Sequence, residues 1–182
     1  MTDLSVRIEN QLEGAPPSIR LVKQSDLRRL EWEGEYTHFR RLYEQAYKRA
    51  EVGRALLWVL DRRQRLIGQV FVLLKSEVDR KLADGRKRAF VHSFRVREAY
   101  RNRGLGGQLM QHAEADLIAR NFRWVTLNVA RDNLAAIRFY ERTGYEKVAR
   151  DEGLWSYIDH LGRRHDVHEP SWRMRKDLLI SD

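Results

Sequence analysis

The chain has 182 residues, 42% of them hydrophobic and 10% aromatic, and disordered chains are poor in both, so we expect one globular domain. The absence of cysteine excludes disulfides, thiolate metal sites and a cysteine nucleophile, and makes the reducing cytoplasm the expected location. A formal net charge of +9 favours anionic partners, including phosphorylated cofactors and nucleic acid, without choosing between them.

Residues 1–17 are predicted to form an N-terminal arm that precedes a single domain, residues 18–182. The stretch "EGAPPS" contains a glycine and two prolines, which neither a helix nor a central strand tolerates. The arm lacks the charged and then apolar pattern of a signal peptide, and no apolar run approaches the roughly 20 residues that span a bilayer. We therefore expect no membrane partner.

The first half of the domain is predicted to contain two helices and four strands. A short helix is expected over residues 26–35, with Ser25 or Asp26 as its N-cap. A longer helix over residues 36–51 has an apolar face at i, i+3, i+4 spacing, formed by Phe39, Leu42, Tyr43, Ala46, Tyr47 and Ala50. Runs of large aliphatic and β-branched residues predict strands, and the cation-rich connector 75–87 is expected to be an exposed hairpin end. The strands cover residues 18–23, 54–61, 65–74 and 88–96.

The second half alternates strands and helices. A helix that begins near Gly104 repeats apolar residues four apart, and a strand follows over residues 123–130. The next helix is expected to begin after Asn133, a favourable N-cap, and to end with a left-handed C-cap at Gly144. The last two strands are predicted over residues 145–150 and 171–180. Together these elements predict an α/β domain, a mixed sheet with helices packed on it.

Residues 101–107, "RNRGLGG", form a glycine-rich loop between a strand and a helix. Glycines let the backbone approach a ligand closely, and the following helix N-terminus presents unpaired N–H groups to an anion. Arg101 and Arg103 add charged donors, so the loop is predicted to bind a pyrophosphate or nucleotide phosphate. It matches neither the dinucleotide fingerprint, which needs a glycine where Leu109 stands, nor the Walker loop. The alternative is a flexible turn with solvated arginines.

Two motifs in this half resemble the GCN5-related N-acetyltransferase superfamily. The first is Arg101-Asn102-Arg103-Gly104-Leu105-Gly106, an Arg-x-x-Gly-x-Gly loop preceded by the strand "VHSFRV". The second is an Asn-x-x-Ala-x-x-Phe-Tyr helix followed by a Thr-Gly-Tyr turn, within "LNVARDNLAAIRFYERTGYEKV". The resemblance covers about residues 18–180 in element order, and it is most specific from Val91 to Val148, where both motifs occur in order.

The resemblance implies that acetyl-CoA is the co-substrate and that the loop amides bind its pyrophosphate. It also implies a mostly antiparallel sheet, flanked by helices, whose fourth and fifth strands splay apart over residues 91–96 and 124–130. Pantetheine is then expected between these strands, paired with backbone groups near Phe94 and Val96. The cofactor-binding residues that it implies are Phe94, Arg95, Val96, Arg101, Asn102, Arg103, Gly104, Leu105, Gly106, Gly107, Asn133 and Tyr140.

Tyr140 is implied by the resemblance to be the general acid that protonates the departing CoA thiolate. Positions 133 and 140 are seven apart, nearly two helical turns, so both lie on one helix face with Ala136 and Ile137. Helix spacing alone favours an ordinary core tyrosine with a satisfied hydroxyl. The surrounding motif reverses that preference.

A general base is also expected, because an alkylamine has a reference pKa of about 10.4 and must lose a proton before it attacks. Some N-terminal acetyltransferases carry a glutamate near the start of the fifth strand, where this chain has Asn128, which cannot act as a base. His92, on the preceding strand, is the nearest titratable side chain and becomes the candidate, although a lone strand histidine is more often structural. Glu31, Glu33 and Glu35 are weaker candidates.

Two further features are expected to be unrelated to function. The histidines of "DHLGRRHDVHE", His160, His165 and His168, stand near Asp159 and Asp166. Their spacing matches no standard zinc pattern, so we expect a loop between the final strands and no metal. The basic stretch over residues 79–88 lacks interleaved aromatic residues and is expected to be a solvated turn, so nucleic acid is not the favoured partner.

We therefore predict an N-acetyltransferase that moves the acetyl group of acetyl-CoA to a primary amine by direct attack, without an acyl-enzyme. The acceptor is a small molecule or a protein or peptide amine, and the +9 charge weakly disfavours polyamines and highly basic peptides. The alternative is a non-catalytic acyl-CoA sensor, or a module that binds RNA or the ribosome through its basic surface. The sequence leaves a homodimer open.

Overall fold

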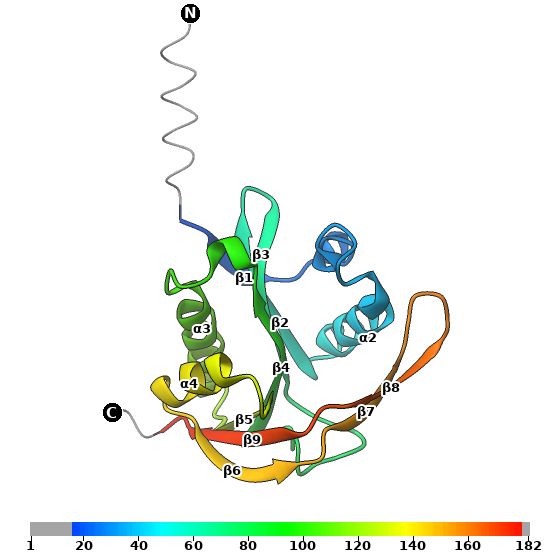
Figure 1. The fold of residues 1–182 in the computed structure, drawn as a ribbon. Coiled ribbons are helices and arrows are strands. Elements are labelled where there is room, and N and C mark those ends of the chain that lie inside the picture. Colours follow the sequence, from blue (N-terminus) through cyan, green and yellow to red (C-terminus); the bar gives the residue numbers. More distant parts are fainter. Residues whose placement is uncertain (1–15, 180–182) are drawn as a thin grey trace, which may run out of the picture.

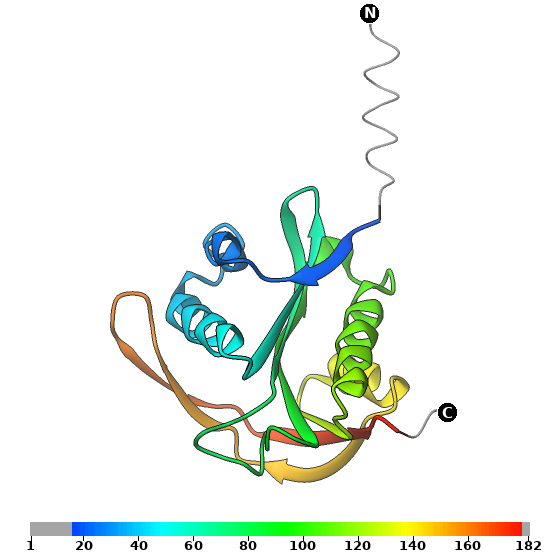
Figure 2. The same ribbon diagram turned by 180° about the vertical axis from the view of Figure 1, so that it is seen from behind.

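The computed structural model describes residues 16–179, and the predicted arm lies outside this part except for Pro16 and Pro17. The described chain folds around a twisted seven-stranded sheet with helices on both faces (Figures 1 and 2). The strand order is β1-β2-β3-β4-β5-β9-β6, and β7 and β8 form a separate two-stranded ribbon. No helix within residues 16–179 is long and apolar enough to cross a bilayer.

The elements follow the predicted order closely. The sheet strands are Ser18–Leu21 (β1), Ala55–Arg62 (β2), Arg65–Leu73 (β3), Arg88–Val96 (β4), Trp124–Ala130 (β5), Glu146–Asp151 (β6) and Ser171–Asp177 (β9). The helices are Arg40–Glu51 (α2), Leu105–Ala119 (α3) and Leu134–Arg142 (α4). The predicted ends of α4 are confirmed, because the Asn133 side chain accepts a hydrogen bond from the Ala136 amide and Gly144 has a φ of +89°.

The sheet is antiparallel except between β4 and β5, which run parallel. Their pairing begins at Arg88 with Trp124 and ends at Val91 with Leu127. Beyond these residues β4 continues to Val96 and β5 to Ala130, but the two strands no longer pair. The fold class predicted from sequence, a mostly antiparallel sheet that opens between its fourth and fifth strands, is thereby confirmed. The opening leaves two facing strand edges with backbone groups available to a ligand.

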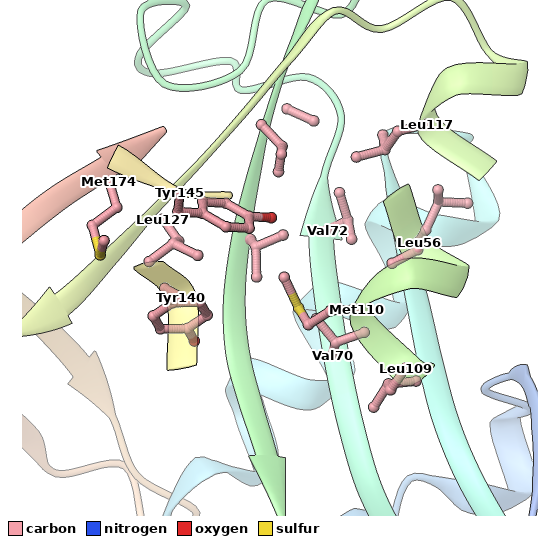
Figure 3. Packing of buried hydrophobic residues seen from close by; sticks show 14 of the residues in the cluster. Leu56, Val70, Val72, Leu109, Met110, Leu117, Leu127, Tyr140, Tyr145 and Met174 are labelled. Carbon is pink, nitrogen blue, oxygen red and sulfur yellow. The ribbon is translucent and has the colours of Figure 1, made fainter. Parts of the chain in front are cut away.

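Each face of the sheet has its own apolar core. On one face, α3 and α4 cover a cluster that includes Leu109, Leu117, Leu127 and Met174 (Figure 3). Because the apolar residues of α3 recur four positions apart, they form one stripe that faces the sheet. On the opposite face, α2 covers a smaller cluster centred on Phe71. Figures 1 and 2 show the two helical layers on either side of the strands.

A buried carboxylate links α3 to the far edge of the sheet. Glu114 accepts hydrogen bonds from the Tyr145 hydroxyl at 2.8 Å and from Lys176 Nζ at 2.8 Å. Burial, together with the nearby Glu114 carboxylate, raises the pKa of Tyr145 well above its usual value, so its hydroxyl stays a donor. This pairing compensates the desolvation of Glu114 in the core beneath α3.

The prediction of a short helix over residues 26–35 is wrong. The chain there forms two single 3-10 turns, Gln24–Asp26 and Arg29–Glu31. Asp26 accepts hydrogen bonds from the Lys23 amide and from Arg20, so its carboxylate caps the start of the first turn instead of a longer helix that begins after it. Trp32 then has a φ of 47°, which a continuing α-helix does not allow.

The prediction of a loop between the last two strands is also wrong, because most of this segment forms a β-hairpin. Leu154–Ile158 (β7) pairs with Arg164–His168 (β8) in antiparallel register. The hairpin extends from the sheet edge toward α2 (Figure 1). Ring contacts between Phe39 and Tyr157, 5.0 Å apart at their centroids, fix it there. The stretch between these strands is polar, so the hydrophobic pattern of the sequence does not reveal the hairpin.

Candidate active site

A bulge in β4 divides its side chains between the two faces of the sheet. Ser93 has a φ of 52°, and the register with β3 shifts at this point. Regular alternation would place His92 and Arg95 on opposite faces. Because of the extra residue, His92 pairs opposite Phe71 and Arg95 opposite Gln69, so both side chains face α2. The bulge therefore brings two basic side chains to one face.

A cleft of about 990 Å³ lies where β4 and β5 separate. It extends from the loop before α3 to the inner face of α4, and it brings together most of the residues predicted to bind the cofactor. These are Phe94, Arg95, Val96, Arg101, Asn102, Gly104, Gly106, Gly107, Asn133 and Tyr140. Two predicted residues do not line it: Arg103 is exposed with its guanidinium over the Tyr100 ring, and Leu105 packs against the core.

The N-terminus of α3 opens into one end of this cleft. The backbone hydrogen bond from the Gln108 amide to the Gly104 carbonyl, 3.0 Å long, is the first of the helix. The amides of residues 105–107 precede it and point out of the helix end. Gly104 has a φ of +76°, which glycine adopts without strain. A Cβ at Gly106 would lie 3.2 Å from the Phe94 ring, so this glycine lets the helix approach β4.

Arg101 reinforces the same end of the cleft. Its Nε donates a hydrogen bond to the Val96 carbonyl at 2.9 Å, which holds the loop against β4. The rest of this exposed side chain remains beside the helix N-terminus. A cation and a set of free amides together form a site for phosphate oxygens.

Tyr140 occupies the middle of the cleft, on the inner face of α4. Its ring packs against those of Phe94, Phe139 and Tyr145, with centroids 5.3 to 6.2 Å apart. Burial raises the pKa of the Tyr140 phenol above its usual value. The hydroxyl is therefore protonated throughout the physiological range and is able to donate a proton to a strongly basic anion beside it.

A second pocket of about 520 Å³ lies on the other side of β4. Its walls come from α2, the inner part of β3 and the start of β7, including Phe39, Tyr43, Phe71 and Trp155. The two cavities share Val91, His92, Ser93, Arg95, Asn128 and Glu169. They therefore meet at the point where β4 and β5 separate. The sequence does not identify β7 as a strand, so the part of the pocket wall that β7 forms could not be predicted from it.

His92 lies at this junction, half-buried and with its ring 5.8 Å from that of Phe71. Burial, with smaller contributions from the positive charges of Arg49 and Arg95, lowers the pKa of His92 to about 4. The imidazole is therefore neutral at pH 7. Its Nδ1 lies 3.1 Å from the Ser93 hydroxyl, which orients the ring.

The three glutamates considered as weaker candidate bases line neither cavity. Glu31 is buried and accepts hydrogen bonds from Arg40 at 2.6 Å and from Thr37 at 2.7 Å. Glu33 is paired with Arg97, which lowers its pKa, and Glu35 is exposed. The geometry therefore does not support a catalytic role for them.

Glu169 is the carboxylate that the sequence interpretation missed. Within residues 16–179 it is the only acidic residue that lines both cavities. It lies in the turn between β8 and β9, where its amide donates to the Gly153 carbonyl at 3.0 Å. Its carbonyl contacts Gly153, which has a φ of +64° and no room for a Cβ. No motif surrounds Glu169, so only the fold brings it to the junction.

The histidines near the C-terminus are not gathered into a metal site. His165 Nε2 lies 2.8 Å from Asp159 Oδ2, and the His165 ring stacks on Tyr157. Within residues 16–179 there is no group of three or more histidine, aspartate or glutamate side chains that could hold a metal ion. The basic stretch 79–88 is a tight turn in which Asp84 accepts hydrogen bonds from three backbone amides.

The comparisons with known proteins agree with this arrangement. The sequence matches the Acetyltransferase (GNAT) family over residues 22–145, and the chain therefore belongs to the GNAT family. No curated protein matches the sequence. The fold is similar to that of Ard1 from Thermoplasma volcanium, with a TM-score of 0.68, 19% identity, and coverage of 91% of this chain and 100% of that one.

Two other solved structures are similar to the same extent. NAA60 from Arabidopsis thaliana in complex with acetyl-CoA has a TM-score of 0.66 and 22% identity, and covers 88% of this chain and 98% of its own. The ribosomal-protein-S18-alanine N-acetyltransferase from Escherichia coli has a TM-score of 0.65 and 18% identity, with coverage of 91% and 96%. At these identities the likeness concerns the fold.

Proposed function

We propose that this protein is an N-acetyltransferase that uses acetyl-CoA to acetylate a primary amine. The observation that carries the proposal is the meeting of two cavities at the opening between β4 and β5. One cavity ends at free helix amides and an arginine, and the walls of the other include side chains from α2, β4 and β7. A reaction between a phosphorylated donor and a separate acceptor needs such a pair of connected sites.

The residues of the larger cleft fit acetyl-CoA. The N-terminal amides of α3 and the Arg101 guanidinium match a pyrophosphate. The unpaired edges of β4 and β5 match the amides of pantetheine, since they offer donors and acceptors in an extended array. Bound acetyl-CoA supplies an activated acyl carbon with a thiolate leaving group.

Two groups handle protons, Tyr140 in the larger cleft and Glu169 at the junction. Tyr140 donates its phenolic proton to the leaving sulfur, and its raised pKa keeps that proton in place until the sulfur becomes anionic. Glu169, directly or through a water, accepts a proton from the incoming ammonium group. His92, whose pKa of about 4 keeps it neutral at pH 7, accepts a hydrogen bond from the amine and so orients it.

The test is a calorimetric titration of the protein with acetyl-CoA at two salt concentrations, followed by thiol release in the presence of a panel of amines. We expect one-to-one binding that weakens with salt, because the phosphate contacts are ionic, and thiol release that depends on an amine. Absence of binding by the folded protein would refute the proposal. Binding without thiol release for any amine would favour a non-catalytic acyl-CoA sensor.

A further inference from the structure

Arg95 lies in an aromatic cage on the α2 side of the sheet. Its guanidinium carbon is 3.8 Å from the centroid of the Tyr36 ring. Three more rings, those of Trp32, Phe39 and Tyr43, lie 5.9 to 6.0 Å from it. The rings hold the guanidinium by cation–π attraction and exclude water from it. The charge is thus fixed in position and partly shielded from water.

Arg95 has no anionic partner in the described chain. Other partly buried arginines on this side are paired with carboxylates: Arg20 with Asp26, Arg40 with Glu31 and Arg97 with Glu33. No carboxylate of residues 16–179 pairs with Arg95, and its Nη1 is buried without a hydrogen-bond partner. A buried donor of a charged group is costly when it has no hydrogen-bond partner, and an anionic ligand beside it would remove that cost.

A second unused donor accompanies this arginine. The Tyr43 hydroxyl is also buried without a hydrogen bond of normal geometry, and it lies beside the Arg95 guanidinium. Burial raises the Tyr43 pKa to about 12, so the proton stays on the oxygen. Both residues line the 520 Å³ pocket. Exposed Arg49 adds a further positive charge to the pocket lining. The α2 side of the pocket therefore offers two donors and a cation to an anionic group.

The opposite wall of the pocket carries negative charge. Glu169 follows β8 at the junction, and it forms no ion pair with Arg95. Asp151 lines the same wall, but its carboxylate is engaged by Arg173 at 2.6 Å. Glu169 is therefore the acidic group available to an ammonium ion. Between the two poles the lining is apolar and aromatic, with Phe39, Leu42, Phe71, Phe90, Leu154 and Trp155.

We propose that the acceptor is a zwitterionic amine, a free amino acid with an apolar side chain, whose carboxylate binds Arg95 and Tyr43. This inference rests on the proposed function and specifies its substrate class. Two donors match the two oxygens of a carboxylate, whereas a phosphate with more oxygens and a second charge would leave some of them unpaired. The amino group then lies toward Glu169 and His92, and the apolar side chain lies against the aromatic wall.

The experiment measures ligand binding to the protein saturated with coenzyme A, so that no turnover occurs. Leucine, phenylalanine and other apolar amino acids are each compared by calorimetry with the matching carboxamide and the matching decarboxylated amine. We expect at least one amino acid to bind ten- to a hundredfold more tightly than both analogues, the range of a charge-assisted hydrogen bond. Equal binding of the carboxamide would overturn the inference and favour a peptide amine, and absence of binding by every amino acid would also overturn it.

Variants test the assignment to Arg95. In Arg95→Gln the advantage of the amino acid over its carboxamide should disappear, whereas Arg86→Gln, an exposed arginine in the turn before β4, should retain it. Tyr43→Phe removes only the hydroxyl and should reduce the advantage about fivefold, which keeps the test decisive if Arg95→Gln is poorly folded. An unchanged advantage in a folded Arg95→Gln or in Tyr43→Phe would refute the assignment.

The two proposals fail in different ways. If coenzyme A and acetyl-CoA do not bind, the proposed acetyltransferase function fails, whatever the amino acids do. If acetyl-CoA binds and an amine without a carboxylate is acetylated as efficiently as an amino acid, the function stands and the substrate class is wrong. The first result is read from the acetyl-CoA titration and the second from the thiol-release assay, both with the same protein.

Discussion

The two cavities that meet at β4 are built from different parts of the polypeptide. The cleft beside α3 and α4 includes much backbone that only particular local conformations expose: helix amides, glycines and the unpaired edges of two strands. The pocket beside α2 consists of side chains that come from α2, β3, β4 and the β7–β8 hairpin. The first site needs particular residue types at fixed spacing, whereas the shape of the second depends on the side chains that line it. This difference makes the two sites separable by mutation.

The largest expected effect comes from filling the cleft. A Cβ at Gly107 would meet no atom within 4 Å, so Gly107→Trp projects a large ring into the cleft without disturbing the packing of α3. Acetyl-CoA affinity should fall at least about 100-fold by calorimetry, because the bound donor and the ring need the same space. Amino acid binding to the α2 pocket should be much less affected.

Gln108→Trp is the matched control for this variant. Gln108 is the next residue of α3, is exposed and does not line the cleft. It should bind acetyl-CoA as the unmodified protein does. Gly106 is a poorer choice for the test, because its Cβ would press on the Phe94 ring and confuse a loss of binding with a change in packing. Unchanged affinity in Gly107→Trp would contradict the location of the donor site.

The next largest effect is expected from a variant that separates the chemical step from cofactor binding within the same cleft. Tyr140→Phe removes the proposed proton donor but keeps the ring, so kcat should fall about 100-fold while the Kd of acetyl-CoA stays unchanged. The control is Tyr145→Phe, whose ring lies 5.6 Å from that of Tyr140. Its hydroxyl bonds to Glu114 in the core, so it should lose stability and keep its rate. Equal kcat in Tyr140→Phe would indicate another acid.

The difference between the two cavities also explains which features can be predicted from the sequence. The loop before α3, the Asn133 cap and the Gly144 turn each depend on a local backbone conformation, and such conformations select residue types that are visible in the sequence. The apolar stripe of α3 is visible for the same reason, because helix geometry repeats over a few residues. Most of the predicted cofactor-binding residues line the cleft, since most belong to these local motifs.

The α2 side depends on contacts between distant residues, and there the sequence predictions are poorer. Glu169 reaches the junction, and Trp155 the α2 pocket, only because β7 pairs with β8, a strand of mostly polar and charged residues without hydrophobic alternation. The bulge at Ser93, which turns Arg95 toward α2, depends on strand register and leaves no mark in the sequence of β4. Asp26 has the residue type of a helix cap, but its carboxylate bonds to Arg20 on β1, a contact that the local sequence does not show.

His92, which lines both cavities, gives a pH-dependent prediction. Its pKa is about 4 in the folded protein and about 6.5 when unfolded, so the unfolded chain binds more protons between these values. The free energy of unfolding should therefore decrease as the pH falls from 6.5 toward 4, by about 1 to 2 kcal/mol from this group at pH 5. Urea denaturation at pH 7 and pH 5, compared between the unmodified protein and His92→Gln, isolates this contribution. Equal losses in both proteins would mean that His92 is solvated.

The smallest effect is expected from a variant of the α2 pocket, and it tests whether acceptor binding can be changed without changing acetyl-CoA binding. Trp155 on β7 is 42% exposed and lines only the α2 pocket, with its ring 6.4 Å from that of Phe39. Trp155→Ala removes one aromatic wall, so the KM of the best acceptor found by the amino acid panel should rise about fivefold, a loss of about 1 kcal/mol. Acetyl-CoA affinity should not change. Leu161→Ala, an exposed position between the two hairpin strands that lines neither cavity, should alter neither value. If Trp155→Ala weakened acetyl-CoA binding as much as acceptor binding, the hairpin would act on both cavities, and they would form one site.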